Sequence, residues 1–127
     1  MKAGTSGDWE YQVLNDPVYG ELNGGAVIFA YTGPGGAVVI PDSFNGVPVK
    51  RIGAQGGVFL NNLQNITNIT VPHGTIWISD QAFANCVNLT EVILPNTLKH
   101  IGVGAFGNCT SLTNITFPNS LENLGDG

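Results

Sequence analysis

Few side chains in this sequence are of types that could carry out chemistry. The histidines are His73 and His100, and the cysteines are Cys86 and Cys109. No H-E-x-x-H, G-x-S-x-G or P-loop motif occurs, and the glycine-rich TGPGG at 32–36 is not followed by Lys-Ser/Thr. Those motifs fix a metal ion, a nucleophile or a phosphate by their spacing, and nothing here replaces them. We therefore predict that the protein is not an enzyme and uses no metal or cofactor.

One set of side chains is better suited to binding than to catalysis. Three of the four Lys and Arg residues fall at two adjacent positions of a recurring pattern, one of which also holds a tryptophan. The first position holds Arg51, Trp77, His100 and Asn123, and the adjacent one holds Lys50, Ile76, Lys99 and Glu122. An aromatic side chain beside cations can form a recognition patch, because tryptophan is enriched at interaction hot spots. The alternative is that Trp77 only covers the edge of the core.

A second candidate surface is polar. The segments ITNITVP, LTEVILP and LTNITFP share one pattern, in which Leu or Ile is expected to point inward. Their outward residues would form rows along one face of a sheet: Thr67, Thr90 and Thr113, with Asn68, Glu91 and Asn114. Such a ladder can hydrogen-bond to a protein or a sugar. The alternative is that these residues are ordinary solvated strand formers.

The two cysteines are 23 residues apart, at the period of an internal repeat. Residues 72–94 and 95–117 align without a gap, and eight of the aligned pairs are identical, including Cys86/Cys109. The repeat therefore predicts that the two thiols lie in neighbouring coils. Their Cα atoms would be about 5 Å apart, within disulfide range. Free thiols and a disulfide both remain open, and free thiols are favoured.

The repeat defines the elements that must position these residues. Each unit consists of a strand, a proline turn, a short second strand and a compact turn holding Ala-Phe and Cys. One such unit cannot bury its apolar side alone, so the units are expected to stack into a solenoid. The expected stacked pairs are Leu89 on Leu112, Val92 on Ile115, Ile78 on Ile101 and Phe83 on Phe106. Upstream, the first repeat carries an insertion around residues 54–60.

The ends of the chain differ from the repeats. Residues 8–14 and 26–31 are predicted to form a β-hairpin, followed by a strand at 37–41. We assign 1–48 to an N-terminal tail and hairpin cap, with the cap at 8–48, and 49–127 to the repeats, as one domain. The last repeat is incomplete, so its apolar end and strand edges are expected to be open. End-to-end self-association is therefore a possible outcome.

The repeats and the segment before them resemble a known family. The sequence LTEVILPNTLKHIGVGAFGNCTSLTNITFPNSLENLG resembles the BspA-like (Treponema pallidum-type) leucine-rich repeat, with Leu-Pro, Ile-Gly, Ala-Phe and Cys in order. The segments YTG (31–33), VVIP (38–41) and NGVPV (45–49) are similar to the usual opening of that family. VFLNNL (58–63) and the loop at 16–25 depart from it. The resemblance implies a mainly β solenoid with short helical or irregular turns, bacterial or protozoan surface location, and adhesion.

Composition narrows the partners further. The chain has 127 residues, only 10% of them charged, and a net charge of -5. An acidic chain poor in Lys and Arg argues against binding nucleic acid, and no apolar run is long enough to insert in a membrane. We expect a non-enzymatic scaffold for protein-protein interaction or adhesion, extracellular or on a bacterial cell surface, which binds host or neighbouring-cell proteins. The alternatives are a glycan-binding module and a structural spacer in a longer surface protein.

Overall fold

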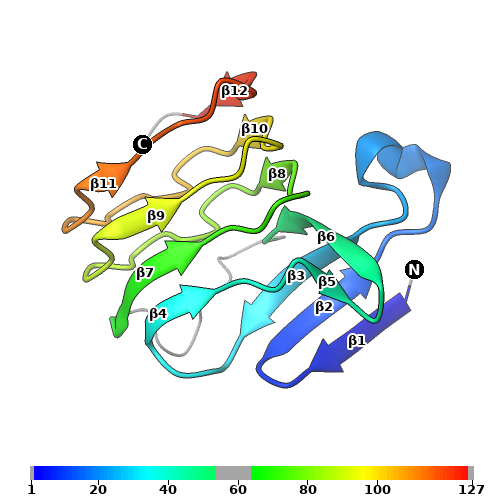
Figure 1. Ribbon diagram of the computed structural model, residues 1–127, viewed down its shortest axis with the longest axis horizontal. Helices are drawn as coiled ribbons and strands as arrows, with labels where there is room; N and C mark the ends of the chain where they lie inside the picture. Colours follow the sequence, from blue (N-terminus) through cyan, green and yellow to red (C-terminus); the bar gives the residue numbers. More distant parts are fainter. Residues whose placement is uncertain (1, 54–63, 126–127) are drawn as a thin grey trace.

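The computed structural model describes residues 2–53 and 64–125, which form two facing β-sheets joined by tight turns (Figure 1). Sheet A holds β1 (Lys2–Ser6), β2 (Trp9–Val13), β3 (Ala26–Tyr31), β6 (Val47–Ile52), β8 (Trp77–Ile78), β10 (His100–Ile101) and β12 (Asn123–Leu124), with β5 (Ser43–Phe44) paired to β6. Sheet B holds β4 (Gly36–Val39), β7 (Ile66–Thr70), β9 (Glu91–Ile93) and β11 (Asn114–Ile115). A short 3₁₀ segment, η1 (Pro17–Leu22), is inserted between β2 and β3. The predicted fold class, a mainly β solenoid with irregular turns, is confirmed.

Successive coils pair in parallel because equivalent residues recur along the chain. On sheet B, Val92 lies opposite Ile115, and on sheet A, Ile78 lies opposite Ile101. The rings of Phe83 and Phe106 stack in the turns with their centres 5.3 Å apart. These three expected stacked pairs are confirmed.

The parallel sheets extend further toward the N-terminus than the 23-residue repeat does. β4 pairs in parallel with β7, and β6 pairs in parallel with β8. In the described residues, these strands occupy the main-strand and second-strand positions of a first coil. The solenoid sheets therefore continue into the segment that the sequence assigns to the cap. The insertion expected around 54–60 and the VFLNNL segment lie outside the described residues.

The N-terminal strands extend sheet A beyond β6. β2 and β3 form the expected antiparallel hairpin, with a register shift between Glu10 and Tyr11, and β3 then pairs in parallel with β6. β1 adds a further antiparallel strand to β2, in the stretch that the sequence suggested was a tail. The sequence KAGTS lacks the alternation of apolar and polar residues that would have indicated a strand. The strand therefore forms through its hydrogen bonds to β2 rather than through a strand pattern in its own residues.

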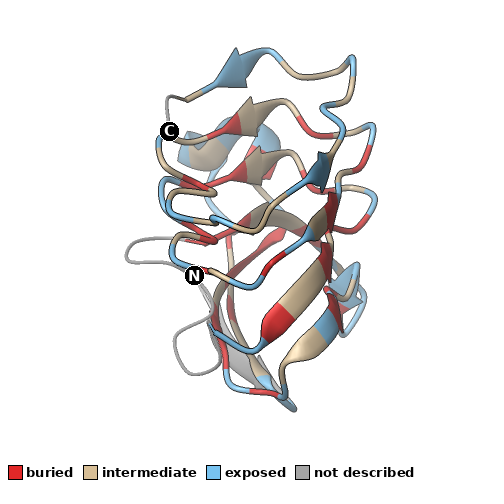
Figure 2. Ribbon diagram, turned by 90° about the vertical axis from the view of Figure 1, so that its left-hand side faces the viewer, coloured by how far each residue is buried: buried red, intermediate tan, exposed pale blue. Residues whose placement is uncertain are grey.

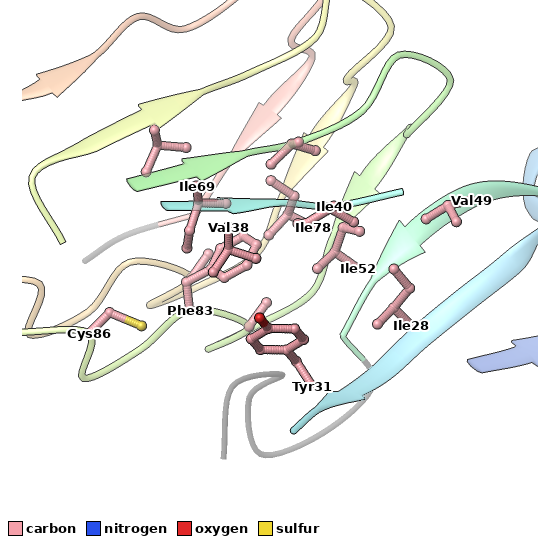
Figure 3. Close-up of a cluster of buried hydrophobic side chains, with 14 of the residues drawn as sticks. Ile28, Tyr31, Val38, Ile40, Val49, Ile52, Ile69, Ile78, Phe83 and Cys86 are labelled. Atoms are coloured by element: carbon pink, nitrogen blue, oxygen red, sulfur yellow. The ribbon is translucent and has the colours of Figure 1, made fainter. Parts of the chain in front are cut away.

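The core lies between the sheets and is filled by aliphatic side chains from both (Figure 3). Ile28, Ile52 and Ile78 from sheet A and Ile69 from sheet B are almost completely buried. Full burial of such a side chain stabilises the fold by about 1.5–3 kcal/mol. Because each coil adds the same inward positions, the apolar contacts continue from one coil to the next.

The turns use residues that tolerate unusual backbone angles. Asn85 and Asn108 occupy equivalent turn positions with φ of 68° and 59°, in the left-handed region that Asn adopts more readily than most residues. Gly102 is required for a different reason, since a Cβ there would lie 2.4 Å from the backbone nitrogen of Asp80 in the preceding coil. The repeated Asn and the Gly after the second strand therefore serve the close stacking of coils.

Burial decreases toward the last described coil (Figure 2). Leu89 is completely buried, but its equivalent Leu112 is only partly buried at the edge of the core. Apolar side chains there border a hollow of about 500 Å³. Its lining includes Ile101, Phe106, Cys109, Leu112 and Leu124. These side chains form an apolar surface on the last described coil.

Candidate functional site

The first candidate row is assembled by the pairing of the second strands. Arg51, Trp77, His100 and Asn123 lie opposite one another across β6, β8, β10 and β12. The guanidinium carbon of Arg51 lies 5.4 Å from the centre of the Trp77 ring, and the Trp77 and His100 ring centres are 4.2 Å apart. His100 Nδ1 and Asn123 Nδ2 are 2.8 Å apart. We call these four residues the Trp77 row.

A chain of two hydrogen bonds through Ser79 holds Arg51 in one orientation. Its Nε donates to Oγ of Ser79 at 2.7 Å, and that hydroxyl donates to the carbonyl of Gly53. Partial burial lowers the pKa of Arg51, and the negative charge of Asp80 opposes this effect. The guanidinium nevertheless stays charged at neutral pH, because an arginine pKa starts far above 7.

The loop at 16–25, which departs from the family pattern, folds against sheet A beside the Trp77 row. Figure 1 shows η1 projecting on the outer side of that sheet. Leu14, Leu22 and Val27 form a small buried cluster, against which Tyr19, Ile76 and Trp77 pack. Trp77 therefore packs on a small second cluster as well as standing in the row.

Two lysines beside the Trp77 row hold this loop in place. Lys50 Nζ donates to the carbonyls of Glu21 and Asn23 at 3.2 and 3.1 Å. Lys99 Nζ forms an ion pair with the Glu21 carboxylate at 2.6 Å. The hydrogen bond and charge of Lys99 lower the pKa of Glu21, and the same contact raises the pKa of Lys99. Much of the positive charge expected to serve recognition is thus directed at the protein's own loop.

A sugar-binding site would need Trp77 to share an exposed platform with other aromatic residues, and Trp9, Tyr19 and Tyr31 do not form one with it. Tyr31 is buried and donates to the carbonyl of Pro34 at 2.7 Å, and Trp9 packs on Tyr31 with ring centres 4.4 Å apart. Tyr19 alone of the three joins the small cluster that includes Trp77. Trp77 itself has Arg51 and His100 against its ring.

The second candidate surface, the outer face of sheet B, is also assembled as expected. Asn68, Glu91 and Asn114 lie opposite one another across β7, β9 and β11. Asn68 Nδ2 donates to Oε1 of Glu91 at 3.2 Å. These three residues form a continuous polar ladder.

The threonine row has a largely structural use. Thr90 Oγ1 donates to the carbonyl of Thr67 at 3.1 Å, and Thr113 Oγ1 contacts the carbonyl of Thr90 at 3.4 Å. Each hydroxyl thereby ties its coil to the preceding one. This bonding uses a donor that we expected to be directed at a ligand.

A column of residues that sequence reasoning missed lies beside the polar ladder. Val39, Thr70 and Ile93 lie opposite one another across β4, β7 and β9. Val39 is 71% exposed and Ile93 is 53% exposed. We call this column and the Asn68–Glu91–Asn114 ladder together the sheet B face. Alternation with the buried Val38, Ile69 and Val92 would have identified the column. The expectation that Leu and Ile of the main strands point inward is wrong for Ile93.

The sheet B face includes a shallow hollow of about 360 Å³ between β9 and β11. Glu91, Ile93 and Asn114 line it, together with Asn96 and Thr116 in and beside the following turns. The lining combines carboxylate, amide, hydroxyl and aliphatic groups, so it can accept both polar and apolar groups of a partner.

The cysteines are free thiols in neighbouring coils. Cys109 Sγ donates to the carbonyl of Phe83 at 3.2 Å. The neighbouring Cys86 thiol lowers the pKa of Cys109 to about 7, while the contact with Cys109 and burial raise the pKa of Cys86. The arrangement favours reaction at Cys109 rather than at Cys86.

Neither a metal site nor a spanning helix is found in the part of the chain that the structure describes. No group of three or more His, Cys, Asp or Glu side chains within 2–53 and 64–125 could hold a metal ion. Over the same residues, no helix has the length and apolar character needed to cross a membrane.

Comparison with known proteins agrees with this geometry. The family model described as the BspA type leucine rich repeat region matches residues 38–127 in six copies. No curated protein matches the sequence.

Three solved structures are similar over nearly the whole chain. A leucine-rich repeat protein from Bacteroides capillosus is 30% identical with a TM-score of 0.79, over 96% of this chain and 86% of its own. A leucine rich cell surface protein from Faecalibacterium prausnitzii is 26% identical with a TM-score of 0.73, over 97% of this chain. The leucine rich repeat protein of Treponema pallidum is 25% identical with a TM-score of 0.63, over 98% of this chain.

This chain spans only 32% of the Faecalibacterium protein and 64% of the Treponema protein. The family match nevertheless covers well over half of the present chain. The chain belongs to the BspA-type leucine-rich repeat family, a family of repeat proteins that generally serve as protein-interaction scaffolds.

Proposed function

We propose that this protein is a non-enzymatic adhesion module that binds a protein partner through the sheet B face. The observation that carries the proposal is the exposed pair Val39 and Ile93 beside the polar ladder of Asn68, Glu91 and Asn114. Exposed apolar side chains bordered by polar groups are typical of protein interaction surfaces.

The stacked coils give this surface a regular geometry. Parallel strands are spaced about 4.8 Å apart, so equivalent side chains are presented at fixed intervals on a backbone held by hydrogen bonds. A partner that docks here meets side chains that are already ordered, which lowers the entropy lost on binding. Repeat scaffolds generally bind their ligands on such an extended surface.

We further propose an extracellular or cell-surface location, with host or neighbouring-cell proteins as ligands. The similar Faecalibacterium prausnitzii structure is described as a cell surface protein, which supports this location.

A glycan-binding module and a structural spacer are the competing functions. The contacts of Arg51 and His100 with the Trp77 ring count against glycan binding, because sugars usually pack on an uncovered aromatic face. An assay of the full chain against both a panel of purified extracellular-matrix proteins and a glycan array separates the three functions. We expect saturable binding to a matrix protein, whereas glycan binding alone, or no binding at all, would contradict the proposal.

A second proposal concerns self-association. The apolar hollow in the last described coil, lined by Phe106, Cys109 and Leu112 among others, offers a surface for another copy of the chain. Light scattering should then show a mass that rises with concentration and falls in Leu112→Glu. A monomeric mass at every concentration would rule this association out.

A further inference from the structure

Arg51 carries a charge for which the described part of the protein provides no ion-pair partner. Its Nε donates to Ser79, but its terminal nitrogens donate to no group within 2–53 and 64–125. Over those residues the ion pair that does form is Lys99 with Glu21. Partial burial removes part of the hydration of the guanidinium, and the Ser79 hydrogen bond and the Trp77 ring replace it only at Nε and at one face.

The sequence that follows Arg51 does not supply a carboxylate. Residues 54–63, which lie outside the described residues, read AQGGVFLNNL and contain no Asp or Glu. Asp80 acts on the charge of Arg51, but its Oδ1 accepts a hydrogen bond from the backbone nitrogen of Val103 at 2.8 Å. Asp80 is therefore oriented toward the backbone of the next coil, and it forms no ion pair with Arg51.

The position of Arg51 is fixed in advance of any ligand. Ser79 holds Nε, and the guanidinium lies over the Trp77 ring, which is itself backed by His100. A guanidinium presents its donors as a rigid planar fork, whose two terminal nitrogens match the two oxygens of a carboxylate. Since Nε is already bonded, the terminal nitrogens are the part of the fork left for a ligand.

We propose that Arg51 is the centre of a second binding site, on sheet A, which takes an aspartate or glutamate side chain from an acidic segment of a protein partner. The carboxylate pairs with the terminal nitrogens of Arg51. The site is separate from the sheet B face and does not depend on the function proposed for that face.

Two features favour an acidic peptide over a carboxylated sugar. Trp77 has Arg51 and His100 against its ring, so its indole is poorly placed to pack on a sugar. Lys50 and Lys99, at the position adjacent to the Trp77 row, are bonded to the loop at 16–25, so Arg51 is the cation that the described residues of this face leave for a carboxylate from outside. One guanidinium fork matches one Asp or Glu side chain.

The probe is a fluorescein-labelled hexaglutamate peptide, titrated against the full chain and followed by fluorescence anisotropy near physiological salt. Arg51→Gln should weaken binding about tenfold or more, because charge-assisted bidentate pairs are lost. Lys2→Gln changes the net charge equally but lies on β1, and it should weaken binding less than about twofold. Arg51→Lys should fall between them, since it keeps the charge and loses the fork.

The unaltered protein supplies a readout that does not depend on the folding of a variant. Its two tryptophans give two indole N–H signals in NMR spectra. Hexaglutamate should shift the Trp77 signal and leave that of Trp9, which packs on Tyr31, unchanged. Equal shifts of both signals, or of neither, would overturn the site.

Three further results would also overturn it. These are equal weakening by Arg51→Gln and Lys2→Gln, hexaglutamine binding as tightly as hexaglutamate, and polygalacturonate binding more tightly than hexaglutamate. Free glutamate tests whether the ligand is a small acid rather than a peptide side chain. It should compete only at far higher concentration than the peptide, and competition at equal concentration would assign the site to a small acid.

Discussion

The rings of Trp77 and His100 lie with their centres 4.2 Å apart and their planes tilted by 41°, although the residues are 23 positions apart in the sequence. The contact arises because β8 and β10 pair in register, which places equivalent residues of neighbouring coils side by side. Trp77 also packs against the Leu14–Leu22–Val27 cluster under the loop at 16–25. It therefore links the row to the loop.

This position of Trp77 makes its removal a test of structure as well as of binding. Trp77→Ala should lower the free energy of unfolding by about 1–3 kcal/mol, less than a fully buried aromatic would, because the side chain is only partly buried. Urea denaturation measures the loss, with His100→Ala as the milder comparison. Stability unchanged in Trp77→Ala would mean that the small cluster contributes nothing.

The gradient of burial along the coils predicts unequal effects for equivalent leucines. Leu89→Ala should cost about 2–5 kcal/mol, because Leu89 is completely buried. Leu112→Ala, in the partly buried position of the next coil, should cost about 1–2 kcal/mol. Thermal or urea unfolding of the two variants checks the difference, and equal losses would contradict the gradient.

The ion pair of Lys99 with Glu21 predicts acid sensitivity of the loop at 16–25. The pKa of Glu21 is lowered in the folded protein from its ordinary value of 4.5, so the pair contributes above that value and is lost as pH falls below it. The raised pKa of Lys99 means that the pair persists at neutral pH and is lost only at strongly basic pH. Hydrogen-exchange protection in the loop, measured relative to the intrinsic exchange rate at each pH, should therefore fall between neutral pH and about pH 3.

The matched variant for this test is Glu21→Gln, which keeps the shape of the side chain and removes its charge. Its loop should exchange faster at neutral pH and show little additional change in acid. An acid response as large as that of the unaltered chain would assign the effect to other groups.

The pair of free thiols predicts selective modification. Because the pKa of Cys109 is lowered to about 7 and Cys109 is partly exposed, iodoacetamide should alkylate it well before Cys86 in the folded chain. The rate should rise as pH increases through about 7. Peptide mass spectrometry identifies the modified residue, and a titration in denaturant should find two thiols. Equal rates at both cysteines, or no free thiol, would contradict this arrangement.

Much of the fold could be predicted from the sequence because equivalent apolar and turn residues recur at a fixed spacing. The spacing that aligns Ile78 with Ile101 also fixes strand register, coil stacking and the membership of both candidate rows. β1 could not be predicted, since KAGTS carries no strand pattern and depends on pairing with β2. The first coil was recognised only in part: Lys50 and Arg51 in β6 were aligned with the later second strands, but β4 was assigned to the cap because it precedes the clear 23-residue period.

The candidate sites were predictable in position but less so in use. The alignment places Thr90 above Thr67, yet it does not show that the hydroxyl bonds to the neighbouring carbonyl. Similarly, Lys50 and Lys99 were placed correctly beside the Trp77 row, but their bonds to Glu21 and Asn23 depend on how the irregular loop folds back. Contacts between a repeat and a segment outside it leave no periodic signal.

The central proposal, protein binding through the sheet B face, is tested most directly with Ile93→Glu. Ile93 is 53% exposed on that face, so the substitution should leave the melting temperature nearly unchanged. Val18→Glu introduces the same charge at a side chain 79% exposed in η1, away from the face, and is the matched control. Binding to the matrix protein found in the panel should fall about tenfold or more in Ile93→Glu and stay within about twofold in Val18→Glu. Equal binding by the two variants would contradict the proposal.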